Sequence, residues 1–260
     1  MGILNVTPDS FSDGGHFFSV DAAVLRALMM VEEGATLIDV GGESTRPGAA
    51  IVGAQEEIDR VVPVIEALRS KILVPISIDT RKPEVMRAAL AAGAGFINDV
   101  TALRAPEALH VAAQACVPVC LMHMLGEPQN MQSKPVYQDV VGEVKAFLAE
   151  RIATCVAAGI ARERLIIDPG FGFGKTLQHN LTLLRRLDEF STLGVPLLIG
   201  VSRKSMLGTL LGNAAPPQRV FAGVALAMYA LSKGATWIRT HDVRATNDVL
   251  KMHTAVMTAV

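Results

Sequence analysis

The segment that decides the fold is Gly2-Ile3-Leu4-Asn5-Val6, followed by Thr7-Pro8-Asp9-Ser10-Phe11-Ser12-Asp13-Gly14-Gly15. A short apolar run, typical of a buried strand, passes an amide at Asn5 and continues into a polar loop that closes on two glycines. Side chains at the carboxyl end of a buried parallel strand are held rigidly, and the loop beyond can close over a ligand. The same arrangement recurs along the chain, which predicts one architecture repeated from end to end.

Apolar runs alternate with amphipathic stretches that have helical spacing. The predicted strands are Ile3–Val6, Thr36–Val40, Pro75–Ile78, Phe96–Asp99, Pro118–Met122, Leu165–Ile167, Pro196–Gly200 and Trp237–Thr240. Strict alternation with nearly continuous hydrophobic strands indicates a parallel sheet covered by helices. Eight units in about 250 residues favour a (β/α)8 TIM barrel, a single domain over residues 1–260, with an open doubly wound sheet as the alternative.

Composition excludes several classes of partner. The chain has 260 residues, 50% of them hydrophobic, and a formal net charge of −1, with no basic run for a nucleic-acid backbone. No apolar stretch approaches the roughly 18–20 residues that span a bilayer, so no membrane partner is expected. Cys116, Cys120 and Cys155 show no CxxC spacing, which predicts reduced thiols and a cytoplasmic location.

Polar side chains stand at or just beyond the carboxyl end of every predicted strand. They are Asn5, Asp39 with Glu43 and Thr45, Asp79, Asn98 with Asp99, His123, Asp168, Ser202 to Lys204, and Arg239 with His241. Any one of them could be structural, and Asp39 and Asp99 are the best candidates for capping the amides of the following loop. Because the strand ends of a barrel share one face, most of these groups should converge on one cavity.

The chemistry of these groups divides into two sets. Asp79, Asn98 and Asp168 can accept hydrogen bonds from a flat, nitrogen-rich heterocycle. Arg239 and His241, with Asn5, suit an anion and its metal ion, since Arg and His offer charge-assisted donors to phosphate.

Two other motifs are weaker. Gly170 to Thr176 is only partly similar to a phosphate-binding P-loop, because its glycine spacing is too short for GxxxxGK[ST]. The histidines form no HxxxH or HExxH pair, which argues against zinc.

Eight motifs together resemble the dihydropteroate synthase family of folate biosynthesis. They are Asn5–Gly15, Asp39–Gly48, Ser77–Thr80, Ile97–Asp99, Met122–Met124, Asp168–Lys175, Ser202–Ser205 and Arg239–Asp242, in the family's order and over nearly the whole chain. The resemblance implies a (β/α)8 barrel transferase that joins 4-aminobenzoate to (7,8-dihydropterin-6-yl)methyl diphosphate by a dissociative displacement. It also implies Mg2+ as the cofactor, sulfonamides as inhibitors and a homodimer formed through the last helices.

The resemblance assigns roles to individual residues. It implies catalytic roles for Asn5, Asp79, Asp168, Lys204 and Arg239. It implies a pterin site of Asp79, Asn98, Met122, Asp168, Phe173, Lys204 and Arg239. It implies a diphosphate site of Asn5, Thr45, Arg46, Arg239 and His241, with Mg2+ at Asn5 and Asp13. The implied 4-aminobenzoate site is Phe11, Thr45, Pro47, Phe173, Lys204 and Ser205, and the start of a helix at Ser205 suits a carboxylate.

Two alternatives stay open at this point. A pterin-dependent methyltransferase would bind a pterin through comparable carboxylates, but need not keep the loops at Thr7–Asp13 and Ser202–Ser205. A non-enzymatic pterin-binding protein would be expected to have lost Asn5, Lys204 or Arg239, and all three are present. Family members usually carry an N-terminal hairpin before the first strand, whereas Met1 stands directly at it, so we expect a chain that lacks this segment.

Overall fold

The computed structural model describes residues 1–7, 20–44, 48–127 and 130–259. Its strands are β1 (Gly2–Asn5), β2 (Ile38–Gly41), β3 (Ile76–Asp79), β4 (Phe96–Asp99), β5 (Val119–Met122), β6 (Leu165–Asp168), β7 (Leu198–Ile199) and β8 (Trp237–Ile238). Each lies at a predicted position, because short runs of β-branched and aliphatic residues suit strands that are buried on both faces.

The strands form a parallel ring. β1 to β6 pair in chain order in one sheet, and β7 pairs with β8 in a second. Single parallel bridges join the two sheets, Ile167 to Leu197 on one side and Gly2 to Thr240 on the other. The Ile3 amide donates to the Thr240 carbonyl (3.0 Å) and the Thr240 amide to Met1 (2.9 Å). The eight strands therefore close as the predicted barrel.

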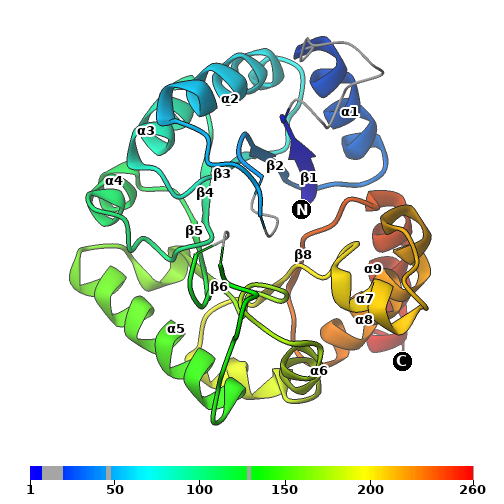
Figure 1. Ribbon diagram of the computed structural model, residues 1–260. Helices are drawn as coiled ribbons and strands as arrows, with labels where there is room; N and C mark the ends of the chain where they lie inside the picture. Colours follow the sequence, from blue (N-terminus) through cyan, green and yellow to red (C-terminus); the bar gives the residue numbers. More distant parts are fainter. Residues whose placement is uncertain (8–19, 45–47, 128–129, 260) are drawn as a thin grey trace.

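Helices surround this ring (Figure 1). They are α1 (Val20–Glu32), α2 (Ala54–Arg69), α3 (Pro83–Ala92), α4 (Ala108–Ala115), α5 (Val140–Ala157), α6 (Leu177–Arg185), α7 (Ser205–Leu210), α8 (Val220–Ser232) and α9 (Val243–Met257). Short 3-10 turns cover Arg162–Arg164, Leu187–Leu193 and Pro216–Arg219. Gly93 ends α3 with a left-handed φ of 118°, as its position before a strand predicts.

The core lies between the ring and the helices. One hydrophobic cluster runs from Leu4 to Val243 and is dominated by aliphatic side chains. A smaller cluster, which includes Met1, Phe96 and Leu198, fills the barrel interior together with Trp237. Because this packing fixes the strands, the side chains at their carboxyl ends have a rigid support.

β7 and β8 are shorter than predicted. The sequence predicted strands over Pro196–Gly200 and Trp237–Thr240, but the ladder covers two residues of each. Pro196 has no amide hydrogen to donate, and the Leu197 amide bonds to the Thr236 hydroxyl (3.1 Å) instead of a neighbouring strand. Beyond Gly200 the chain makes a turn, and Lys204 at its end lines the pocket described below.

Candidate active site

A pocket opens where the strands end. Its volume is about 360 Å³, solvent at its mouth included, and its lining is Asp79, Asn98, Val100, Met122, Asp168, Phe171, Phe173, Gly200, Lys204 and Arg239. The seven residues that the sequence assigned to a pterin are all among them. The structure thus brings together side chains from β3, β4, β5, β6 and the segments that follow β6, β7 and β8.

Arg239 connects the acidic groups of the pocket. Its Nε donates to Asp39 Oδ2 and its Nη2 to Asp79 Oδ2, each at 2.6 Å. Asn98 Nδ2 donates to the same Asp39 oxygen at 3.0 Å. Arg239 stands just after β8, so this ion-pair cluster reaches across the ring to β2 and β3.

The sequence did not predict that Asp39 supports the pocket. We expected it to cap the following loop, but it holds Arg239 and Asn98, the two neighbours that line the pocket. Its side chain is fully buried, and its Oδ1 has no hydrogen-bond partner among the described residues. Its place at a strand end was the signal, and only the closed ring shows which residues it faces. Asp99, in contrast, accepts bonds from Thr101 and Leu103 and caps its loop as expected.

Burial sets the ionisation of the pocket carboxylates. It raises the pKa of Asp79 to about 7, against the lowering effect of Arg239. Burial also raises the pKa of Asp168, although the Gly170 amide donates to Asp168 Oδ1 at 2.7 Å. Burial alone would lower the pKa of Arg239, but Asp39 and Asp79 outweigh it and raise that pKa. The guanidinium thus stays positively charged, and it lies among carboxylates whose negative charge is disfavoured by burial.

Lys204 and Phe173 form the opposite wall. The Lys204 ammonium lies 4.0 Å from the centre of the Phe173 ring, within cation–π range. Burial lowers the pKa of Lys204 to about 8, while Asp168 acts to raise it. Both residues line the same pocket as Asp168, which therefore presents a flat aromatic face, a cation and an anion to one ligand.

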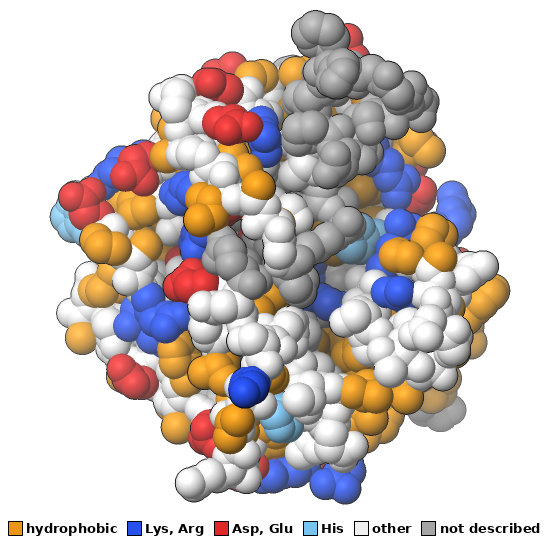
Figure 2. Space-filling view, viewed as in Figure 1, with side chains coloured by type: hydrophobic (Ala, Val, Ile, Leu, Met, Phe, Trp, Pro, Cys, Tyr) orange, Lys and Arg blue, Asp and Glu red, His pale blue; other side chains and the backbone are white. Residues whose placement is uncertain are grey.

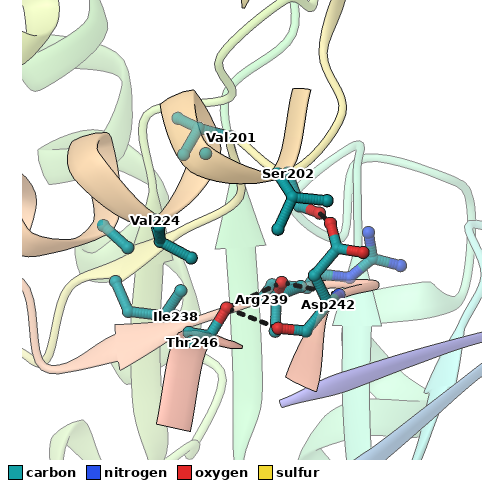
Figure 3. Close-up of a pocket in the computed structure, with 11 residues that line it drawn as sticks. Val201, Ser202, Val224, Ile238, Arg239, Asp242 and Thr246 are labelled. Atoms are coloured by element: carbon teal, nitrogen blue, oxygen red, sulfur yellow. Dashed lines mark hydrogen bonds between the residues drawn. The ribbon is translucent and has the colours of Figure 1, made fainter. Parts of the chain in front are cut away.

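Beyond the ends of β7 and β8 lies a second group of polar side chains, of which Figure 3 labels Ser202 and Asp242. Ser202 Oγ accepts from the His241 amide and lies 3.1 Å from His241 Nδ1. Figure 3 shows Ser202 directed toward Asp242, at 3.5 Å, beside a small cavity under α8. Arg203 pairs with the same Asp242 carboxylate.

His241 differs in charge from what the sequence predicted. We expected a cationic donor, but burial, with Arg239 and Arg203 nearby, lowers its pKa to about 3. The imidazole is therefore neutral at pH 7, and any bond it gives to a phosphate is that of a neutral N–H donor.

The loop after β2 is held at its two ends. Glu43 Oε1 accepts from the Val52 amide (3.0 Å), and Glu43 Oε2 lies 3.0 Å from Lys82 Nζ and 3.4 Å from Arg81 Nε. Lys82 also forms an ion pair with Glu57 on α2. The predicted ligand residues Thr45, Arg46 and Pro47 belong to this loop but lie outside the described residues, as do Phe11 and Asp13.

Three other predicted positions lie away from the pocket lining. Asn5 ends β1 opposite Gly41 and is half-buried. Ser205 starts α7, as predicted, and is exposed next to Lys204. His123, expected to converge with the other strand ends, is instead buried edge-on against Phe147 (5.0 Å between ring centres). The apolar side of α5 takes this imidazole out of the pocket.

Comparison with known proteins places these residues in a family. The model of pterin binding enzymes matches residues 1–241. The dihydropteroate synthase of Escherichia coli strain K12 is 53% identical over 259 residues, which cover 100% of this chain and 92% of that protein.

Solved structures agree. A Yersinia pestis dihydropteroate synthase with a sulfonamide drug complex superposes with a TM-score of 0.95 at 53% identity, covering 99% of this chain and 94% of the other. A Xanthomonas albilineans dihydropteroate synthase in complex with 7,8-dihydropteroate has a TM-score of 0.91 at 51% identity, covering 100% and 93%. A barrel whose strand ends converge on one pocket and a match over nearly its full length lead to one conclusion: the chain belongs to the pterin binding enzyme family.

Proposed function

We propose that the chain is a dihydropteroate synthase. It transfers the dihydropterin-6-ylmethyl group from its diphosphate to 4-aminobenzoate, with 7,8-dihydropteroate and diphosphate as products. The observation that carries the proposal is the convergence of Asp79, Asn98, Asp168, Lys204 and Arg239 on one pocket. The kinship with proteins of that name, one of them bound to 7,8-dihydropteroate, supports it.

The pterin lies in the pocket between the carboxylates and Phe173. Asp168 Oδ1 is occupied by the Gly170 amide, so its other oxygen is free to accept from the pterin's amino edge. Asn98 directs its Nδ2 to Asp39, which leaves its oxygen as the atom that faces a ligand donor. The Arg239 guanidinium, fixed by two carboxylates, offers a flat surface on which the ring can stack.

The displacement needs charge stabilisation more than proton transfer. The bond between the methylene carbon and the diphosphate oxygen breaks, and diphosphate leaves with the electron pair. Asp79 and Asp168 stabilise positive charge on the pterin, while Arg239 and the His241 imidazole with Asn5 receive the departing anion. The arylamine nitrogen then bonds to carbon and loses a proton to water. Since an arylamine is already neutral at pH 7, no strong base is required.

In the described residues the proposed 4-aminobenzoate site comprises Phe173, Lys204 and Ser205. The family resemblance also assigns Phe11, Thr45 and Pro47 to it, which lie outside the described residues. Lys204 connects both substrates, because it contacts the Phe173 ring and precedes Ser205 directly. A sulfonyl group can replace the carboxylate there, which would make sulfonamides competitive inhibitors. The sulfonamide complex of the Yersinia pestis relative supports this.

Mg2+ is the proposed cofactor. It commonly takes only one or two protein ligands and completes its shell with water and substrate phosphates. The amide oxygen of Asn5 at the end of β1 is a ligand of the required type. The family resemblance adds the Asp13 carboxylate, which lies outside the described residues. When bound, the ion would neutralise the developing charge on the diphosphate.

The wider assignments are also proposals. The continuous core from Leu4 to Val243 supports a single domain over residues 1–260. None of the helices in the described ranges is long and apolar enough to cross a membrane. Cys116, Cys120 and Cys155 are free thiols, which supports a cytoplasmic location. On the face drawn in Figure 2, the Lys and Arg side chains of the described residues are interspersed with Asp, Glu and hydrophobic side chains rather than gathered in one band.

Product formation tests the function. The chain is incubated with (7,8-dihydropterin-6-yl)methyl diphosphate and Mg2+, with or without 4-aminobenzoate, and diphosphate and 7,8-dihydropteroate are measured. Equal amounts of both products, formed only with 4-aminobenzoate, are expected. Tight pterin binding without diphosphate release would instead favour a binding protein. Methyl transfer from methyltetrahydrofolate to a cobalamin protein would favour the methyltransferase alternative.

A further inference from the structure

The mechanism above gives no role to the buried side chain of Lys175. Lys175 follows the glycine-rich segment Gly170–Gly174 after β6 and is only 3% exposed. Its ammonium lies 2.9 Å from His123 Nδ1, 2.9 Å from the Gly170 carbonyl and 3.0 Å from the Phe173 carbonyl. All three partners are uncharged, since burial lowers the pKa of His123 to about 2. The His123 carbonyl is a fourth, more distant acceptor at 3.4 Å. Burial lowers the pKa of Lys175 to about 7, although Asp168 acts to raise it, so the side chain is an N–H donor to these groups whether or not it is charged.

These partners are not spread at random. Gly170 donates its amide to Asp168 Oδ1, and Phe173 carries the ring that lies under the Lys204 ammonium. Lys175 therefore bonds to the carbonyls of the two residues that connect directly to the pocket's anion and to its aromatic wall. Lys175 is thus a buried side chain that bonds to this segment at two places, Gly170 and Phe173.

The contact with the neighbouring loop is equally close. A Cβ atom on Gly170 would lie 1.9 Å from the His123 carbonyl, so only glycine allows the two backbones to approach. His123, fixed edge-on against Phe147, gives Lys175 an immobile acceptor on the β5 side. Asn180 and Tyr137 hold the same segment by bonding to Gly172 and Gly174.

We propose that Lys175 is a positioning residue of the transfer reaction, with His123 as its anchor. It touches neither substrate. It orders the Gly170–Gly174 segment so that Phe173 and Asp168 keep the spacing that both substrates need. The proposal rests on the proposed function, because it names how that site is kept in shape.

The test compares two variants that each remove a cation from backbone carbonyls. Lys175→Met removes the ammonium with little change in volume. Arg151→Met is the control, because Arg151 similarly donates to the carbonyls of Ala102 and Leu103, on the loop after β4. Melting temperature, kcat and the KM for each substrate are measured for the parent and both variants, well below the lower melting temperature.

Both variants should have a lower melting temperature than the parent, but only Lys175→Met should change the kinetic constants. A misplaced segment is expected to raise its KM for 4-aminobenzoate about tenfold and to lower kcat, because small displacements in a site are costly. Near-parental kinetics in folded Lys175→Met, or an equal loss in Arg151→Met, would overturn the positioning role. A parent that forms no dihydropteroate would instead contradict the proposed function.

His123→Asn provides a milder second variant in case Lys175→Met does not fold. It removes the imidazole that packs against Phe147 and leaves Lys175 with backbone carbonyls, those of Gly170, Phe173 and, at 3.4 Å, residue 123. The KM for 4-aminobenzoate should therefore rise about threefold. In the double variant the two effects should be less than multiplicative, because both act through one segment. Unchanged kinetics in His123→Asn, or fully independent effects where both variants fold, would contradict the proposal.

Discussion

At the scale of single residues, Asp168 gives the sharpest test of the pterin assignment. In Asp168→Asn the amide oxygen can keep the bond from the Gly170 amide, which turns the NH2 group toward the pterin's own donors. Losing a charged bond and leaving a buried donor unpaired each cost roughly 1.5–3 kcal/mol. We expect kcat/KM for the pterin diphosphate to fall on the order of 100-fold or more, with the fold intact.

Asp99→Asn is the matched control for this substitution. Asp99 is also buried at a strand end, that of β4, but its carboxylate caps Thr101 and Leu103 rather than lining the pocket. It should lose stability and keep its affinity for the pterin. If Asp168→Asn stayed within about threefold of the parent in kcat/KM, Asp168 would have no place in the pterin site.

Lys204 predicts the alkaline side of the pH profile. Its pKa is lowered to about 8, so the ammonium is lost as pH rises through that value, and kcat/KM should fall with it. The free energy of unfolding changes in the opposite direction. Between pH 8 and 10.5 Lys204 is protonated in the unfolded chain but not in the folded one, so its contribution to stability grows as the pH rises over that range. Lys204→Arg should be less active at pH 7 but show no fall near pH 8. A parent profile flat to pH 9.5 would contradict this.

At the scale of elements, the loop after β2 depends on Glu43. Glu43→Gln keeps an acceptor for the Val52 amide and loses the pairs with Lys82 and Arg81, whereas Glu43→Ala loses both. We expect the KM for 4-aminobenzoate to rise about threefold in the first and about tenfold in the second. Asp59→Ala, which breaks an exposed hydrogen bond with Gln55 on α2, is the control and should change neither KM. Equal KM values in all three variants would show that this loop works independently of Glu43.

How far the sequence predicted each element depends on how local its signal is. Residues 96–99 form the predicted strand because a buried parallel strand needs only its own apolar run. β7 was overextended because Pro196 and the Thr236 hydroxyl interrupt its ladder, and the hydroxyl comes from a distant segment. The prediction that His123 faces the pocket was wrong for the same reason, because the Phe147 ring that packs against it lies on α5.

The polar strand ends were predictable as a group, but their pairings were not. Asp79, Asn98 and Asp168 follow their strands in sequence and meet in the pocket as expected. That Asp39 bonds to Arg239, 200 residues away, depends on closure of the ring. Lys175 is part of the Asp168–Lys175 motif, but its burial could not be predicted, because it depends on His123 in the loop after β5.

At the scale of the whole molecule, α8 and α9 present an apolar face that a second copy could cover. Phe221, Tyr229, Met252, Val256 and Met257 are all exposed there. With the family resemblance, this supports the proposed homodimer. Sedimentation should show a dimer for the parent and a monomer for Phe221→Glu with Met252→Glu. Leu73→Glu, on an exposed turn before β3, should remain dimeric. A parent that sediments as a monomer at all concentrations would refute the dimer.

The salt bridges of Arg239 have a consequence for resistance to inhibitors. β8 joins β1 through little more than one bridge, and Arg239 ties the β7–β8 pair to β2 and β3 across the ring. The group that would recognise substrate is therefore also part of what keeps the barrel shut. A cell under selection by an inhibitor that stacks on Arg239 could not discard that contact without loosening its own enzyme. Compounds aimed at this guanidinium should meet fewer escape routes than compounds aimed at the loops.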